Sequence, residues 1–230
     1  MKIQGSIALV TGANRGLGLA FAQALLAAGA VKVYAAARDP SKVTLAGATP
    51  LKLDIANPAE VAAAARTASD VTLLVNNAAI ARTVAFLAAD AEPALRESLE
   101  TNLFGTLSMT RAFAPVLKAN GGGAIVNMLS IASWLHRPTL AVYAASKSAA
   151  WALTNGARHE LREQGTLVVG VHAGFIDTDM AKPFQGPKSR PEDVVRQALA
   201  AVEWGLEEVL ADQWTRDVKL GLSAERASYL

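Results

Sequence analysis

The sequence predicts an α/β protein in which a parallel sheet is covered by helices on both faces. Short apolar runs rich in β-branched residues alternate with longer segments rich in Ala and Leu, which is the pattern of repeated βαβ units. A glycine-rich turn joins the first expected strand to the first expected helix. A length of 230 residues suits one such domain, and because no linker or repeat interrupts the chain we expect residues 1–230 to form a single domain.

The expected elements follow one another along the whole chain. We expect seven strands, at residues 7–10, 31–37, 50–53, 71–75, 124–128, 167–171 and 208–210. Helices are expected over 17–28, after the Asn-Pro pair at 57–58, over 93–118 as one helix or two in sequence, around 141–163 and from 191 onward. The glycines at 121–123 mark a loop before the fifth strand.

Composition and charge narrow the classes of function. The 22 Lys plus Arg residues against 20 Asp plus Glu give a net charge of +2, and no basic run is dense enough to indicate nucleic-acid binding. The absence of cysteine excludes disulfides and thiolate metal sites, and the three histidines lack metal-ligand spacing. The chain enters a strand within six residues and has no apolar stretch of membrane-spanning length. We therefore expect a cytoplasmic protein without a signal peptide, a metal or a membrane partner.

The turn between the first strand and the first helix has the spacing Gly-x-x-x-Gly-x-Gly. Glycines there permit a tight turn and the close approach of a pyrophosphate, while the helix N-terminus offers free N–H groups. A glycine-rich turn without such a role is the alternative, but the position inside a βαβ unit favours a dinucleotide site and hence a Rossmann fold. The turn residues expected to bind the dinucleotide are Gly12, Asn14, Arg15, Gly16, Leu17 and Gly18.

The end of the second strand predicts which dinucleotide binds. A free ribose 2′-OH is usually held there by an acidic side chain, whereas a 2′-phosphate favours a guanidinium. Here the strand ends at Arg38, and Arg15 in the glycine turn is a second cation, so we predict NADP(H). Asp39 follows directly, and we expect it to cap a turn or to face solvent.

Ser130, Tyr143 and Lys147 are the candidate catalytic residues. The segment 141–151 favours a helix, and the i, i+4 spacing sets Tyr143 and Lys147 on one face. The lysine charge is expected to lower the tyrosine pKa from its ordinary value of about 10. Such a phenol, helped by a serine hydroxyl, can protonate a carbonyl oxygen as a hydride arrives at the carbon, or act in reverse on an alcohol. Since Tyr-x-x-x-Lys also occurs by chance in helices, this assignment depends on the other motifs.

Taken in order, these motifs resemble those of the classical short-chain dehydrogenase/reductases over nearly the whole chain. Val75-Asn-Asn-Ala-Ala79 is similar to the family element Asn-Asn-Ala-Gly, and residues 172–178 are similar to Pro-Gly-x-x-x-Thr, with Ala79 and Ala173 replacing the usual glycine and proline. The resemblance implies a three-layer, doubly wound Rossmann fold with a seven-stranded parallel sheet of order 3-2-1-4-5-6-7. It also implies a fourth catalytic residue, Asn102, that kinks its helix and holds a water in a proton relay to the lysine. Further cofactor contacts that it implies lie at Asp54, Ile55, Asn77, Ala78, Tyr143, Lys147, Gly174, Ile176 and Thr178.

The substrate pocket is expected to be mostly apolar. Its walls are expected from the segment after Ser130 and from the irregular segment near 175–185, at Trp134, Leu135, His136, Val142, Phe175, Met180 and Phe184. No cluster of cations appears there to hold a phosphate or a carrier, although Arg137 is close in sequence. We therefore expect a small hydrophobic ketone or aldehyde, or the corresponding alcohol, as the substrate. The short segment between the second and third strands also resembles compact, carbonyl-reductase-like members of the family.

Two other functions stay open. One is reduction of a carrier-bound 3-oxoacyl group, because residues 174–180 resemble those reductases as well. The other is a nucleotide-sensing regulator without chemistry, against which stand all four catalytic-type residues. The helices near 93–118 and 141–163 carry more apolar positions than one sheet face covers, and members of the family commonly pair through them, so we expect a homodimer or a homotetramer.

Overall fold

The computed structural model describes all 230 residues and contains one seven-stranded parallel sheet of order β3-β2-β1-β4-β5-β6-β7, as predicted. The strands are β1 (Ile7–Thr11), β2 (Lys32–Ala37), β3 (Thr49–Lys52), β4 (Leu73–Asn76), β5 (Ala124–Met128), β6 (Leu167–His172) and β7 (Glu208–Leu210). β1 pairs in parallel with both β2 and β4, so the strand order reverses at this pair. The carboxyl ends of β1 and β4 therefore border the crevice where sheets of this class hold ligands.

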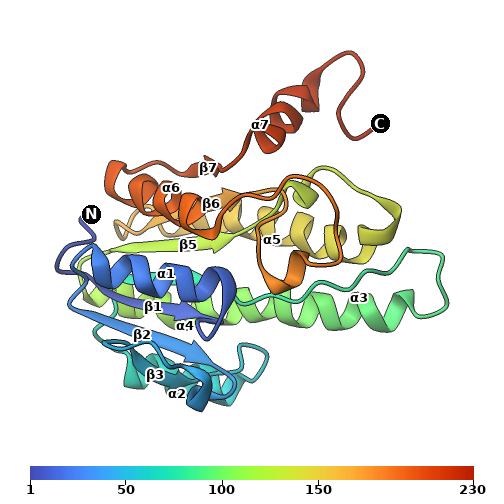
Figure 1. Cartoon of the computed structure of the whole chain (residues 1–230). Helices are drawn as coiled ribbons and strands as arrows, with labels where there is room; N and C mark the ends of the chain where they lie inside the picture. Colours follow the sequence, from blue (N-terminus) through green and yellow to red (C-terminus); the bar gives the residue numbers. More distant parts are fainter.

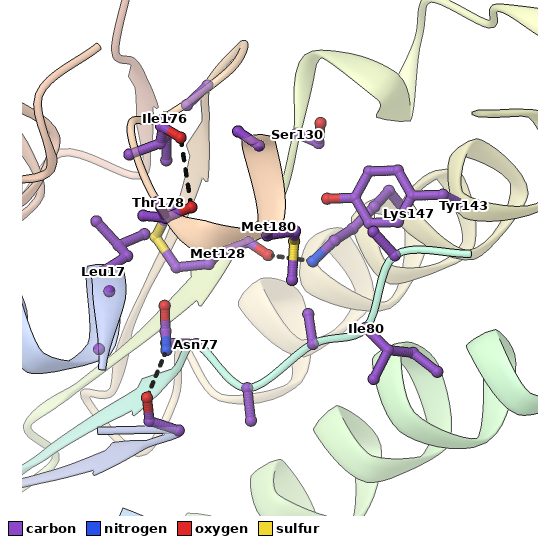
Figure 2. Close-up of a pocket in the computed structure, with 18 of the residues that line it drawn as sticks. Leu17, Asn77, Ile80, Met128, Ser130, Tyr143, Lys147, Ile176, Thr178 and Met180 are labelled. Carbon is purple, nitrogen blue, oxygen red and sulfur yellow. Dashed lines mark hydrogen bonds between the residues drawn. The ribbon is translucent and has the colours of Figure 1, made fainter. Parts of the chain in front are cut away.

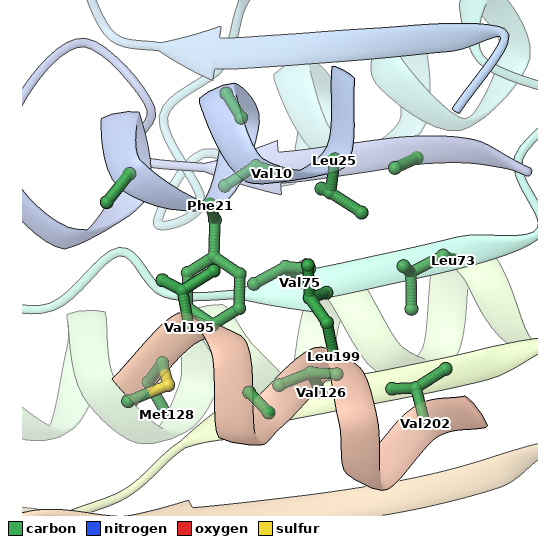
Figure 3. Packing of buried hydrophobic residues seen from close by; sticks show 14 of the residues in the cluster. Val10, Phe21, Leu25, Leu73, Val75, Val126, Met128, Val195, Leu199 and Val202 are labelled. Atoms are coloured by element: carbon green, nitrogen blue, oxygen red, sulfur yellow. The ribbon is translucent and has the colours of Figure 1, made fainter. Parts of the chain in front are cut away.

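Helices cover the sheet on both faces, which gives three layers (Figure 1). α1 (Gly16–Ala27) and α6 (Pro191–Trp204) pack on one face, and α2 (Pro58–Thr67), α4 (Thr106–Ala119) and α5 (Ala141–Glu160) pack on the other. Side chains alternate along β1, so Ala8 and Val10 join one core and Leu9 joins the other. Figure 3 shows Phe21 and Val195 meeting over the first of these faces. Burying each such side chain stabilises the fold by about 1.5–3 kcal/mol.

The helix expected over 93–118 is divided in two. α3 (Ala91–Leu99) passes into a π-helical turn, η2 (Glu100–Gly105), before α4 begins. A Cβ at Gly105 would lie 2.8 Å from the Ile55 side chain, so a glycine is needed where η2 passes the end of β3. The turn carries Asn102, and a π-turn inside a helix is a feature often found at functional sites.

Most boundaries agree with the prediction within two residues. Among the strands the largest shift is at β4, which begins at Leu73 because the Val71 N–H bonds to the Ala68 carbonyl and closes the preceding helix instead of joining the ladder. Asn57 caps α2 as expected, and Asp39 caps the short 3₁₀ turn η1 (Pro40–Lys42). The prediction missed α7 (Gln213–Leu220), which lies outside the three layers (Figure 1).

No helix combines the length and the apolar character that crossing a bilayer requires.

Candidate active site

A cavity of about 600 Å³ opens at the carboxyl ends of the strands. It is lined from the β1–α1 turn, the ends of β2 to β6, the start of α5 and the segment after β6. Every residue expected to bind the dinucleotide lines it, as do Ser130, Tyr143 and Lys147. The fold thus brings together motifs that lie more than a hundred residues apart in the sequence.

The glycine turn is shaped by close backbone contacts. A Cβ at Gly18 would lie 2.1 Å from the Gly12 carbonyl oxygen, and Gly12 itself has φ +67°. Neither position accepts a larger residue without a shift of backbone. The turn is fastened to the end of β4, because the Thr11 hydroxyl accepts hydrogen bonds of 3.0 Å from the N–H groups of Asn77 and Ala78. The N-terminus of α1 consequently faces the cavity with no acidic side chain in its first turn.

The charged groups near this turn are distributed unequally. Arg38 is exposed, lines the cavity and forms no ion pair within the chain. Arg15 lies 3.5 Å from Asp179, measured from Nη1 to Oδ2. Asp39 accepts hydrogen bonds from the backbone N–H and the hydroxyl of Ser41, and does not line the cavity. The end of β2 therefore presents an available guanidinium and no competing carboxylate.

The candidate catalytic side chains come from two adjacent elements. Ser130 follows β5, while Tyr143 and Lys147 lie one turn apart on α5, with the tyrosine hydroxyl pointing into the cavity (Figure 2). Lys147 Nζ is 5.8 Å from the centre of the Tyr143 ring, which agrees with the shared face expected from their spacing. The ammonium donates a 2.7 Å hydrogen bond to the Met128 carbonyl. Ser130 Oγ accepts a 3.1 Å hydrogen bond from the Ala132 N–H, which leaves the serine O–H available to donate to Tyr143 or to a substrate oxygen.

Burial dominates the acid–base properties of this pair. It raises the pKa of Tyr143 to about 12, and hydrogen bonding with the Ser130 side chain acts in the opposite direction. Burial also lowers the pKa of Lys147, which is only 4% exposed, to about 8. The expectation that the lysine lowers the tyrosine pKa is therefore wrong for the protein alone. The cause is that burial withdraws the phenol from water, which disfavours its charged form.

Asn102 lies beside the cavity and does not line it. Its side chain is 2% exposed, and its amide exchanges two 2.9 Å hydrogen bonds with the backbone of Ile80. Its Nδ2 also donates to the Ser146 hydroxyl at 2.9 Å, and that hydroxyl donates to the Tyr143 carbonyl at 2.7 Å. Asn102 therefore joins η2, the segment after β4 and the helix that carries the tyrosine.

Three of the seven substrate-pocket predictions are wrong. Leu135, Phe175, Met180 and Phe184 line the cavity, whereas Trp134, His136 and Val142 do not. The short turn after Ser130 directs Trp134 inward, where its ring stacks on buried His172 at 3.9 Å between centroids. His136 is exposed and faces Ser148, and Val142 is buried in the core.

Among the lining residues that the sequence did not predict are Leu140 and Trp214. Trp214 reaches the cavity from α7, and no motif or spacing connects it with the catalytic segment.

Comparison with known proteins agrees with this arrangement. The family described as short chain dehydrogenase matches residues 6–188. Short chain dehydrogenase mpl6 of Monascus purpureus is 35% identical over 220 residues, covering 88% of this chain and 73% of the relative. The 3-oxoacyl-[acyl-carrier-protein] reductase of Vibrio cholerae is 31% identical over 192 residues, covering 79% and 78%. A crystal structure of a short chain dehydrogenase from Burkholderia cenocepacia in complex with NADP is 43% identical, has a TM-score of 0.94 and covers 98% of this chain and 96% of that chain.

The matched segment runs from the strand before the glycine turn to the end of the irregular segment after β6, and so includes Ser130, Tyr143 and Lys147. The chain belongs to the short-chain dehydrogenase family of oxidoreductases.

Proposed function

We propose that the protein is an NADPH-dependent reductase of ketones or aldehydes that also works in reverse as an alcohol dehydrogenase. The observation that carries this proposal is that Ser130, Tyr143 and Lys147 line the same cavity as the glycine turn and Arg38. A proton-transfer group and a dinucleotide cradle in one cavity are what hydride transfer to a carbonyl requires.

The residues of the cradle fit NADP(H). The glycines at 12 and 18 keep the turn tight against the end of β4, and the N–H groups at the start of α1 would bind the pyrophosphate. The free guanidinium of Arg38 suits a 2′-phosphate. The similar protein from Burkholderia cenocepacia binds NADP in its crystal structure, which supports the same choice here. When bound, the cofactor supplies the hydride or accepts it.

Four side chains would supply the proton transfer, the charge stabilisation and the positioning that hydride transfer needs. Tyr143 Oη gives its proton to the carbonyl oxygen, and the free proton of Ser130 stabilises the charge that develops on that oxygen. The Lys147 ammonium has one N–H on the Met128 carbonyl and two left for the cofactor or a water. Asn102 acts as a positioning residue, because its hydrogen bonds hold the first turn of α5 through Ser146.

The protonation state of Tyr143 favours carbonyl reduction at neutral pH. A phenol with a pKa near 12 is protonated there, which is the form that carbonyl reduction consumes. Alcohol oxidation needs the same group to accept a proton, so its rate is expected to rise as the pH is raised.

Replacing the tyrosine by phenylalanine tests this function. In Tyr143→Phe the ring stays and the transferable proton is lost, so kcat for a panel of ketones and aldehydes should fall about 10²–10⁴-fold. NADPH oxidation is followed by absorbance, and NADPH binding, measured by fluorescence, should change little. Tyr229→Phe, at an exposed tyrosine near the C-terminus, is the matched control and should keep full activity. A Tyr143→Phe protein with substantial turnover would refute the assignment.

A second candidate is reduction of carrier-bound 3-oxoacyl groups. It is favoured by relatives such as the Vibrio cholerae reductase, which is 31% identical. Comparing kcat/KM for a 3-oxoacyl-carrier thioester with kcat/KM for a free aryl ketone separates the two candidates. A protein that binds NADPH and reduces neither compound would instead favour the nucleotide-sensing regulator.

We also propose that the protein forms a homodimer or a homotetramer through α4 and α5. Phe104, in the turn before α4, is 48% exposed and offers apolar surface to a partner. Light scattering of the native protein would measure the number of subunits.

A further inference from the structure

Two guanidinium groups that line the cavity form no ion pair within the chain. Arg38 follows β2, and Arg137 precedes α5, so they lie on opposite sides of the switch between β1 and β4. The other charged groups of the lining are engaged or already assigned: Arg15 pairs with Asp179, Asp54 accepts from the Ala56 N–H, and Lys147 belongs to the catalytic set. Since one free guanidinium suffices for a 2′-phosphate, the second calls for another explanation.

Arg137 is held in place by an aromatic ring. Its guanidinium carbon lies 5.2 Å from the centre of the Trp214 ring, and the side chain forms no ion pair and no hydrogen bond. A guanidinium held against a ring face by cation–π attraction keeps its N–H groups available at the edge. Those groups match the two oxygens of a carboxylate.

Trp214, which lies against Arg137, is fixed to the backbone that follows β6. Asp212 caps α7 by accepting from the Thr215 N–H at 2.8 Å, and its other oxygen accepts from the Gly174 N–H at 2.7 Å. A Cβ at Gly174 would lie 3.1 Å from Trp214, so the indole packs directly on this backbone. Trp214 is therefore fixed relative to the segment that follows β6, and Arg137 is preorganised with it.

The wall beside the guanidinium is aromatic. The Phe175 ring lies 6.0 Å from the Trp214 ring and stacks on Phe184 at 4.8 Å, measured between centroids. All three rings line the cavity that also contains Tyr143. Flat apolar walls with one cation suit a substrate that has an aromatic body and one anionic group.

We propose that Arg137 determines specificity by binding a carboxylate, so that the preferred substrates are aryl ketones or aldehydes that carry a carboxylate. This inference rests on the proposed carbonyl-reductase function. The carboxylate oxygens would accept from the Arg137 guanidinium while the aryl ring lies along Phe175 and Trp214, and the carbonyl would point toward Tyr143.

A matched pair of substrates tests the proposal on the whole enzyme. 4-Acetylbenzoate and 4′-methylacetophenone have similar shapes and differ in charge. Wild-type enzyme with NADPH should have a lower KM for the carboxylate, and Arg137→Gln should raise that KM about ten-fold or more because a charge-assisted hydrogen bond is lost. The kcat for the carboxylate, and both kcat and KM for the neutral ketone, should stay within about two-fold of the wild-type values. The reason is that the contact to Arg137 binds the substrate and the transition state equally well, so its loss raises KM and leaves kcat unchanged.

Two further variants separate a specific contact from a general effect of charge. Arg137→Lys keeps the charge and loses the bidentate geometry, so its KM for the carboxylate should be intermediate. Arg190→Gln removes an exposed guanidinium that does not line the cavity and should leave both substrates unaffected. An equal loss on both substrates in Arg137→Gln, or no loss on either, would overturn the proposal.

A binding measurement keeps this outcome distinct from a failure of the proposed function. 4-Isopropylbenzoate cannot be reduced, and its binding to NADP⁺-loaded protein can be measured by calorimetry. The wild type should bind it, Arg137→Gln should bind it about ten-fold more weakly, and neutral cumene should bind the two proteins equally. If the enzyme reduces neutral ketones but shows no preference for the carboxylate, the role proposed for Arg137 is wrong and the proposed reductase function stands. If no carbonyl compound is reduced, the proposed reductase function is wrong. If the wild type then also fails to bind 4-isopropylbenzoate, the role proposed for Arg137 is wrong as well.

Discussion

Arg38 is the side chain that we expect beside the 2′-phosphate, the group by which the two dinucleotides differ. The Arg38 guanidinium is exposed, unpaired and part of the cavity lining, while Asp39 is turned toward Ser41. The placement of Arg38 at the cavity was predictable from sequence, because the end of a strand fixes where the following residue lies. Its binding of a 2′-phosphate stays a prediction.

Exchanging this charge should exchange the cofactor preference. Arg38→Asp places a carboxylate where a 2′-phosphate would be repelled, so kcat/KM with NADPH should fall about 10- to 100-fold or more. The kcat/KM with NADH should rise, because a carboxylate can accept from the free 2′-OH. Steady-state rates with both cofactors measure the effect, and Arg66→Asp on exposed α2 is the control. An unchanged preference in Arg38→Asp would contradict the prediction.

Single residues also mark where sequence reasoning failed. Trp134 is apolar, large and close to Ser130 in sequence, which made it a plausible wall residue. Its direction depends on a 3₁₀ turn and on stacking with His172, a contact between residues 38 positions apart. Proximity along the chain does not reveal which way such a side chain turns.

At the scale of elements, η2 shows how far the sequence predicts a break in a helix: the resemblance implies a kink at Asn102, but the π-helical form of the turn was not predicted. The apolar spacing of 93–118 permits a continuous helix, and the π-turn is supported by contacts from outside the helix. Gly105 passes Ile55, and Asn102 bonds to Ile80. Strands and glycine turns are encoded locally by residue type, whereas this turn depends on the segment after β4.

Removing the Asn102 amide should loosen this junction. Asn102→Ala leaves the partly buried N–H and carbonyl of Ile80 without a partner, so the free energy of unfolding should fall by about 1–3 kcal/mol. kcat should fall as well, because Ser146 loses its fixed position under Tyr143. Ser146→Ala removes one of these links and should cost about 1 kcal/mol. Denaturant unfolding and steady-state rates measure both effects, and an Asn102→Ala protein as stable as wild type would refute this account of η2.

At the scale of the whole molecule, buried ionisable groups couple stability to pH. Burial lowers the pKa of His172, whose side chain is fully buried, to about 4, and it raises the pKa of Tyr143 to about 12. Between pH 6.5 and 4 the unfolded chain binds a proton at His172 that the native protein does not, so stability falls as the pH falls. From pH 10 to 12 the native protein retains the Tyr143 proton that the unfolded chain releases, so stability falls as the pH rises.

His172 should account for much of the stability that the protein loses as the pH falls from 7 to 4. The shift from 6.5 to about 4 corresponds to roughly 3 kcal/mol of native stability lost between neutral pH and pH 4. His172→Asn should be less stable at pH 7 and should lose roughly 3 kcal/mol less than the wild type over this range. His159→Gln, at an exposed position on α5, is the control. Denaturant unfolding at a series of pH values measures how the free energy of unfolding changes with pH. The same pH dependence for His172→Asn and wild type would disprove the assignment to His172.

A single transition in each unfolding curve would support our proposal that residues 1–230 unfold as one domain.

Trp214 lies in a different part of the chain from the other candidate site residues. The family match ends at residue 188, so the indole beside Arg137 lies outside the matched segment, whereas the glycine turn and Tyr143 lie inside it. Replacements within α7 should therefore change the proposed preference for a carboxylate and leave the proposed proton transfer at Tyr143 in place.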